Sequence, residues 1–71
     1  MSKKLYFLVR ADKYDIEEPE FFDTYCEAFA EMKRQYGFFS KGCTGELNDD
    51  NAWCLGDDFM TIWKIFDMQI E

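Results

Sequence analysis

The longest regular hydrophobic pattern in the chain runs from Pro19 to Tyr36 and predicts one long amphipathic helix. At about 100° per residue, the apolar side chains fall within roughly a third of the circumference and charged side chains occupy the far side. Pro19 suits the first helical position, and Gly37 is placed to end the helix. The predicted apolar stripe consists of Phe21, Phe22, Tyr25, Ala28, Phe29, Met32 and Tyr36.

Alternating side chains before this helix predict a strand from Lys4 to Arg10. Its two faces would both be largely apolar, which favours a central position in a sheet over an edge. One face would carry Leu5, Phe7 and Val9, and the other Tyr6, Leu8 and Arg10.

Short strands and turns are expected after the helix. Cys43 to Leu47 predicts a strand, residues 48–51 a turn, and Ala52 to Leu55 an antiparallel return. Residues 56–58, Gly-Asp-Asp, form a second turn signal.

The last stretch, Phe59 to Glu71, fits two structures. Its Thr, Ile, Trp and Phe residues favour a strand over residues 59–66, with residues 68–71 trailing from it. A helix capped by Asp57 or Asp58 is the alternative.

These elements predict an α+β fold in a single domain, residues 1–71. One long helix would pack on a small antiparallel or mixed sheet in the order β-α-β-β-β. A single helix covers only one face of a sheet, yet the first and last strands are apolar on both faces. The second face would be covered by a loop containing Phe38 and Phe39 together with the C-terminal tail, or by a second copy or another protein.

The charge balance narrows the classes of partner. Fifteen acidic residues stand against eight basic ones, with no histidine, for a net charge of −7. This charge repels phosphate, so direct nucleic-acid binding is not expected even if aromatic side chains lie on an open sheet. The same charge favours encounter with a basic protein surface.

No apolar run approaches the roughly 20 residues that cross a bilayer, so no membrane segment is expected. Cys26, Cys43 and Cys54 form an odd set without C-x-x-C spacing. Reduced thiols and a cytoplasmic location are therefore predicted.

Residues that would carry catalysis are scarce. The chain has no histidine to serve as a base and no glycine-rich phosphate loop, so we expect no enzyme and no cofactor. The acidic connector, residues 11–18, could attract a hard cation, but its spacing does not match an EF-hand loop. A solvated loop without a metal is the preferred interpretation.

Residues 46–71 hold seven acidic residues against one basic residue, Lys64, and four of the seven lie in two turns predicted at opposite ends of the strand Ala52 to Leu55. Such a surface can serve solubility alone, or it can dock on a basic site by imitating the spaced charges of nucleic acid. The candidate partner-binding residues are Asp49, Asp50, Asp57, Asp58, Glu46, Trp53, Tyr14, Glu27 and Glu31.

In size, acidity and lack of catalytic groups, the chain resembles the small phage-encoded inhibitors of host machinery, such as anti-CRISPR and anti-restriction proteins. The resemblance is one of overall character and implies stoichiometric blockade, in the host cytoplasm, of a basic nucleic-acid-binding site or of an assembly surface. Two other classes stay open. One is a structural or accessory subunit that homodimerises through the uncovered sheet face, and the other is a small-ligand or metal-binding domain.

Overall fold

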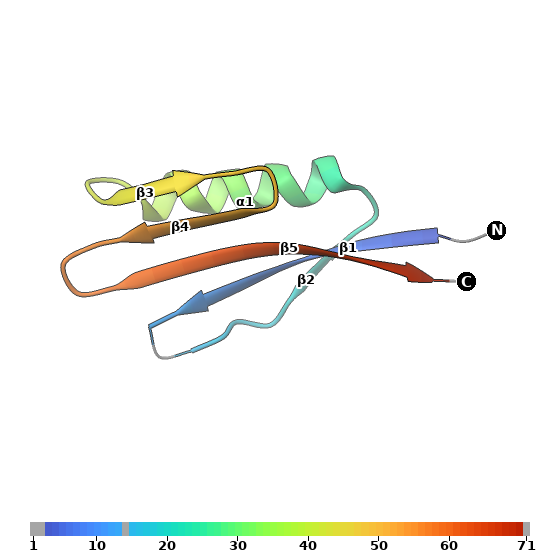
Figure 1. The fold of residues 1–71 in the computed structure, drawn as a ribbon, viewed down its shortest axis with the longest axis horizontal. Coiled ribbons are helices and arrows are strands. Elements are labelled where there is room, and N and C mark those ends of the chain that lie inside the picture. The colour runs from blue at the N-terminus through green and yellow to red at the C-terminus, as the bar shows by residue number, and fades with distance from the viewer. Residues whose placement is uncertain (1–2, 14, 71) are drawn as a thin grey trace.

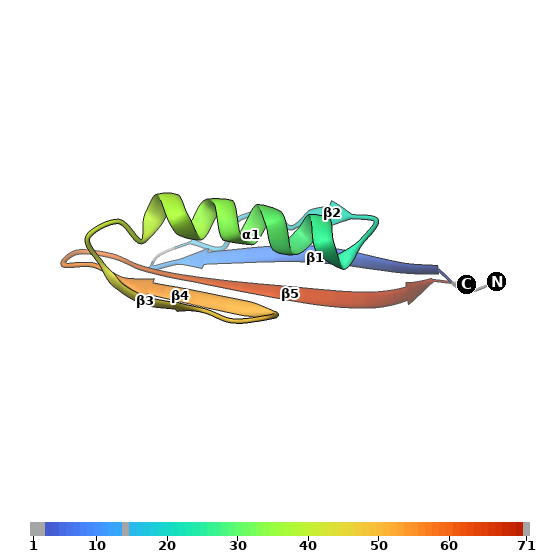
Figure 2. The same ribbon diagram turned by 90° about the horizontal axis from the view of Figure 1, so that it is seen from above.

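A computed structural model describes residues 3–13 and 15–70 and shows one helix packed on one face of a five-stranded antiparallel sheet (Figures 1 and 2). The order across the sheet is β2-β1-β5-β4-β3. This confirms the predicted α+β fold, to which a short additional strand contributes. The elements are β1 (Lys3–Asp12), β2 (Glu20–Phe22), α1 (Tyr25–Phe39), β3 (Thr44–Leu47), β4 (Asn51–Leu55) and β5 (Met60–Ile70).

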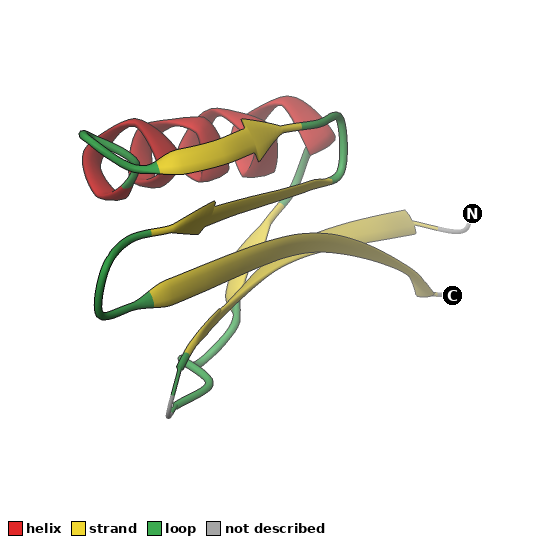
Figure 3. Cartoon of the chain, turned by 60° about the vertical axis from the view of Figure 1, so that its left-hand side comes forward, coloured by secondary structure: helices red, strands yellow, loops and turns green. Residues whose placement is uncertain are grey.

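Strands β1 and β5 form the longest pairing, from Lys3 opposite Ile70 to Asp12 opposite Thr61. The predicted central position of β1 is confirmed, because it lies between β2 and β5. The strand interpretation of the last stretch is also confirmed, but the expected tail is not. Residues 68–70 continue β5 because β1 extends to Lys3 and pairs with them. Figure 3 shows this twisted pair and the helix on one side of the sheet.

The predicted start of the helix is wrong. Thr24 caps α1, its hydroxyl accepting a hydrogen bond from the Glu27 backbone N–H at 3.2 Å. A threonine at this position satisfies a free helix N–H, a stronger start signal than Pro19 provides. The segment before it becomes β2, in which Phe22 lies opposite Tyr6 of β1.

The predicted end of the helix is also wrong. Gly37 lies inside α1, which continues to Phe39 and closes with a hydrogen bond from the Ser40 N–H to the Tyr36 carbonyl at 2.8 Å. Gly42 takes the left-handed conformation, with φ of 73°, on the way to β3. Phe38 and Phe39 therefore belong to the helix and not to a loop.

The core lies between α1 and the sheet. Trp63 of β5 is fully buried, and the rings of Tyr36 and Phe39 lie 5.9 and 5.8 Å from its own. The buried hydrophobic residues are Leu8, Ala28, Met32, Ala52, Cys54, Trp63 and Ile65. Apart from the two helical residues, all of them lie on one face of the strands, which is the face that α1 covers.

A buried polar network ties the helix to the sheet. The Trp63 indole N–H donates to Gln35 Oε1 at 2.9 Å. The Gln35 amide in turn donates to Glu20 of β2 at 2.9 Å and to Glu31 of α1 at 2.7 Å. One glutamine thereby joins α1, β2 and β5.

The three cysteines are free thiols, as the sequence predicts. Burial raises the pKa of the Cys54 thiol. Among the helices of the described ranges, none has the length and apolar character needed to cross a membrane.

Candidate protein-binding face

The face of the sheet opposite α1 is the candidate site. Side chains alternate along a strand, and residues opposite each other on neighbouring strands share a face. The β1–β5 register therefore places Leu8 and Ile65 under the helix, and Phe7 and Phe66 on the other side. We call this other side the open face, with the apolar residues Leu5, Phe7, Val9, Ala11, Phe21, Trp53, Leu55, Met60, Ile62, Phe66, Met68 and Ile70.

Within the described residues, neither predicted cover reaches the open face. Phe39 packs on the helix side, against Trp63 and within 4.9 Å of the Arg10 guanidinium. Phe38 is 69% exposed on α1. The C-terminal stretch is part of the sheet itself. In Figure 2 all of the helical layer lies on one side of the strands.

Two apolar rows cross the open face. In the first, the rings of Phe21, Phe7 and Phe66 follow one another across β2, β1 and β5, with centroids 5.7 and 5.2 Å apart. In the second, Ile62 lies between Trp53 of β4 and Ala11 of β1. Both rows run across strands and so join four of the five strands into one apolar surface.

This surface is larger than a monomer usually exposes. Phe66, Ile62 and Trp53 are 42%, 44% and 37% exposed. Taking about 200 Å² for each large side chain, the eight residues of the open face exposed by more than a third present roughly 700 Å² of apolar area. The largest apolar patch of a typical monomer is about 300–600 Å².

Three charged residues of the described strands share the open face: Lys3 opposite Ile70, Lys64 and Glu46. Lys64, between the two rows, directs its ammonium to the Asp50 carboxylate at 2.8 Å. The hydrogen bond from Lys64 lowers the pKa of Asp50. Glu46 lies opposite Trp53 on the edge strand β3.

The acidic turns lie at the two ends of β4, as the sequence predicts. Asp49 and Asp50 precede the strand, and Asp57 and Asp58 follow it. The Tyr25 hydroxyl donates a hydrogen bond to the Asp49 carbonyl. Two effects raise the pKa of this tyrosine: first its burial, and second the negative charge of the nearby Asp49 carboxylate. Asp50 reaches the open face through its ion pair with Lys64, whereas Asp58 lines a cleft on the helix side together with Phe39.

The other candidate residues lie elsewhere. Glu27 and Glu31 are on α1, which covers the opposite face of the sheet. Glu31 pairs with Arg34, whose hydrogen bond lowers the pKa of this carboxyl. Tyr14 lies outside the described residues. The candidate set therefore divides between two sides of the molecule.

Sequence reasoning missed Phe21 as a member of this face, because it assigned that residue to the helical stripe. The signal that could have found it is Thr24, a strong cap that ends any preceding extended segment. Phe7, Phe66 and Ile62 were visible as apolar residues on strands with two apolar faces.

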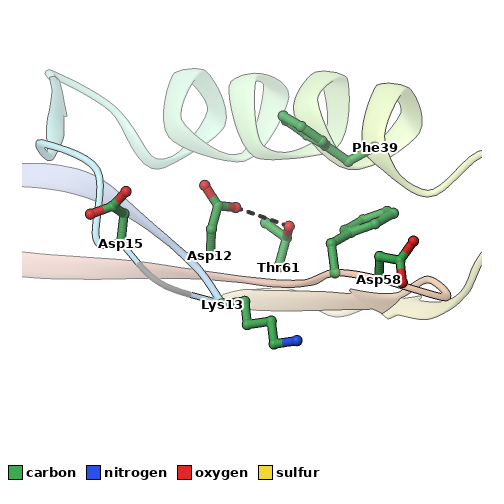
Figure 4. Close-up of a pocket in the computed structure, with 7 residues that line it drawn as sticks. Asp12, Lys13, Asp15, Phe39, Asp58 and Thr61 are labelled. Atoms are coloured by element: carbon green, nitrogen blue, oxygen red, sulfur yellow. Dashed lines mark hydrogen bonds between the residues drawn. The ribbon is translucent and has the colours of Figure 1, made fainter.

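A cleft of about 460 Å³ lies at the end of the β1–β5 pair (Figure 4). Asp12 accepts a hydrogen bond from the Thr61 hydroxyl there at 3.0 Å, and the rings of Phe39 and Phe59 form apolar walls. The acidic lining attracts cations. Across residues 3–13 and 15–70, no group of three or more His, Cys, Asp or Glu side chains is placed to hold a metal ion.

Comparison of the chain with protein-family models, with curated proteins and with solved structures finds no match.

Proposed function

We propose that this chain is a non-catalytic protein–protein interaction module that binds its partner through the open face. The observation that carries the proposal is the pair of apolar rows, joined along β1 by Val9, on the side of the sheet that α1 leaves uncovered. Roughly 700 Å² of exposed apolar side chain is unfavourable in water, and burial against a partner removes that cost.

The arrangement of polar groups supports the same function. Protein interfaces have a centre depleted of charge and a polar rim. Here the aromatic and aliphatic rows occupy the centre, and Asp50 and Glu46 lie beside them, on the turn before β4 and on the edge strand β3. Large aromatic side chains such as Trp53 and Phe66 are the usual anchors of binding energy.

Methionine oxidation tests this proposal and does not require the partner to be identified. Met60 and Met68 lie on the open face and are 43% and 46% exposed, whereas Met32 is fully buried in the core. If the face is bound, brief peroxide treatment should oxidise Met60 and Met68 much more slowly than in the urea-unfolded chain. Mass spectrometry of both purified protein and cell extract gives the rates, with Met32 as the protected internal reference. Oxidation of Met60 and Met68 at the unfolded rate in both samples would refute the proposal.

A second candidate function rests on the acidic turns. Asp49–Asp50 and Asp57–Asp58 are separated by β4, a five-residue strand about 17 Å long. Such spaced charge beside an aromatic residue, Trp53, suits a stoichiometric inhibitor that occupies the basic, nucleic-acid-binding site of another protein. The charges would steer the encounter, and the aromatic side chain would slow dissociation.

Neutralising the four turn aspartates together tests this second candidate. An exposed ion pair contributes only about 0–1 kcal/mol, so single Asp→Asn changes should have weak effects. The fourfold variant should associate several-fold more slowly with a basic partner captured at low salt, with a flatter salt dependence. Surface plasmon resonance at several salt concentrations measures both effects.

The matched control removes the same number of charges from the segment before the helix, at Asp15, Glu17, Glu18 and Asp23. If the control slows association as much as the turn variant does, net charge alone is responsible. If neither salt nor either variant changes binding, the acidic turns do not contribute to it, and the open face is the better account of the binding surface.

A further inference from the structure

We infer that the occupant of the open face is a second copy of this chain. The two sheets would pack face to face, with a helix on each outer side. This inference rests on the proposed function, because it names the partner of the same surface.

The available area matches what a stable dimer needs. A standard interface buries about 800 Å² on each partner. The open face presents roughly 700 Å² of apolar area before any contribution from its polar margin. A second copy offers an equal area by symmetry, so neither surface would be left partly uncovered.

The shape of the chain points to the same arrangement. The molecule measures 47 × 22 × 14 Å, and its radius of gyration is 12.9 Å, against about 11 Å for a compact domain of this length. It is a thin two-layer slab whose broad side is the open face. Two packed sheets lie about 10 Å apart. Stacking two copies therefore gives four layers, helix, sheet, sheet and helix, in which each open face is buried by the other.

The distribution of charge favours a copy over a basic partner. A chain with a net charge of −7 repels its own copies, and of the acidic residues in the described strands the register places one, Glu46, on the open face. The open face is where two copies can approach with the fewest like charges between them. A basic partner would instead have to desolvate its cations against Phe66, Ile62 and Trp53, which supply no counter-charge.

The charged groups of the face allow this contact. Lys64 already has its counter-ion in Asp50 of the same chain, and the pair is half-exposed beside the turn that precedes β4. Glu46 lies on the edge strand. A twofold axis between the sheets makes the contact isologous, with β5, the middle strand of each sheet, at its centre.

Dimerisation through this face has a characteristic salt dependence. Acidic residues at the rims of two copies repel each other, and salt screens that repulsion because the Debye length falls from about 10 Å at 0.1 M to about 3 Å at 1 M. Salt also strengthens apolar burial when the anion is sulfate. The dimer should therefore tighten several-fold between 0.1 M and 1 M salt, whereas binding to a basic partner would weaken.

Sedimentation equilibrium of the purified chain tests the inference. We expect a mass that rises with concentration to a plateau at twice the 8.5 kDa of one chain. Ile62→Lys, at the centre of the open face, should lower the dimerisation constant at least tenfold. Phe38→Lys is the matched control, since it makes the same charge change at an exposed aromatic on α1 and should leave the dimer intact.

Circular dichroism verifies that each variant is folded. If Ile62→Lys does not fold, Met68→Lys, near the end of β5, replaces it in the same experiment. The salt series tests the inference independently, because it uses the wild-type chain. A monomer at all concentrations and salts would overturn the inference, as would growth past the dimer without a plateau.

The methionine experiment separates this failure from that of the proposed function. One outcome is that the purified chain is monomeric and that Met60 and Met68 are protected only in cell extract. This outcome would refute the inference that the occupant is a second copy, and it would show that a different protein covers the face. Unprotected methionines in both samples, together with a monomeric mass, would refute both proposals.

Discussion

Replacing Trp63 with alanine should destabilise the domain by about 3–5 kcal/mol. Trp63 is fully buried, and its ring contacts Tyr36 and Phe39 of α1, so truncation removes the largest side chain between helix and sheet. At about 0.05–0.15 kcal/mol per residue, that cost is a large part of the total stability of so small a domain. Urea unfolding followed by circular dichroism measures the loss.

Trp53→Ala is the control for this substitution. Trp53 is the other tryptophan, lies on the open face and is 37% exposed. Its truncation should cost the monomer much less than the loss of Trp63, because no layer of the same chain packs over it. Equal costs for the two variants would show that the helix side is not the principal core.

The importance of Trp63 was not evident from the helical pattern. That pattern places Phe29 near the middle of the apolar stripe, but Phe29 is only partly buried, whereas Ala28 and Met32 are fully buried. The covered face is turned toward Gln35, a polar residue outside the predicted stripe that is buried beside Ala28 and Met32. A hydrophobic pattern cannot identify a buried glutamine, so the core residues of the helix were ranked wrongly.

Strand prediction succeeded where the alternation was long. β1 and β5 alternate over many residues, and the two sets of side chains predicted for β1 do lie on opposite faces of the sheet. β2 could not be found in this way, because three residues carry no measurable period. Pairing with Tyr6, Phe7 and Leu8 of β1 stabilises it, and this is a tertiary interaction that local sequence does not encode.

The candidate site was only partly predictable for a similar reason. Turn chemistry located the aspartates at the ends of β4, since Asn, Asp and Gly favour turns. The surplus of apolar faces over helices indicated an uncovered face. The residues that form it could be assembled only from the strand order, which brings Phe21, Phe66 and Trp53 from separate segments onto one surface.

Replacing Gln35 with leucine should cost about 1–3 kcal/mol, although leucine is a good helix former of similar size. Gln35 is buried and accepts the hydrogen bond of the Trp63 indole N–H, which would then be left without an acceptor in the core. The change also removes the donor that links Glu20 of β2 to α1, so β2 should fray before the rest of the sheet. Hydrogen exchange should show faster exchange of the Phe22 amide, and urea unfolding gives the loss in the free energy of unfolding.

Lys33→Leu, at an exposed position of the same helix, is the control and should change stability little. If Gln35→Leu were as stable as the wild type with an unchanged β2, the network would contribute nothing beyond its packing volume.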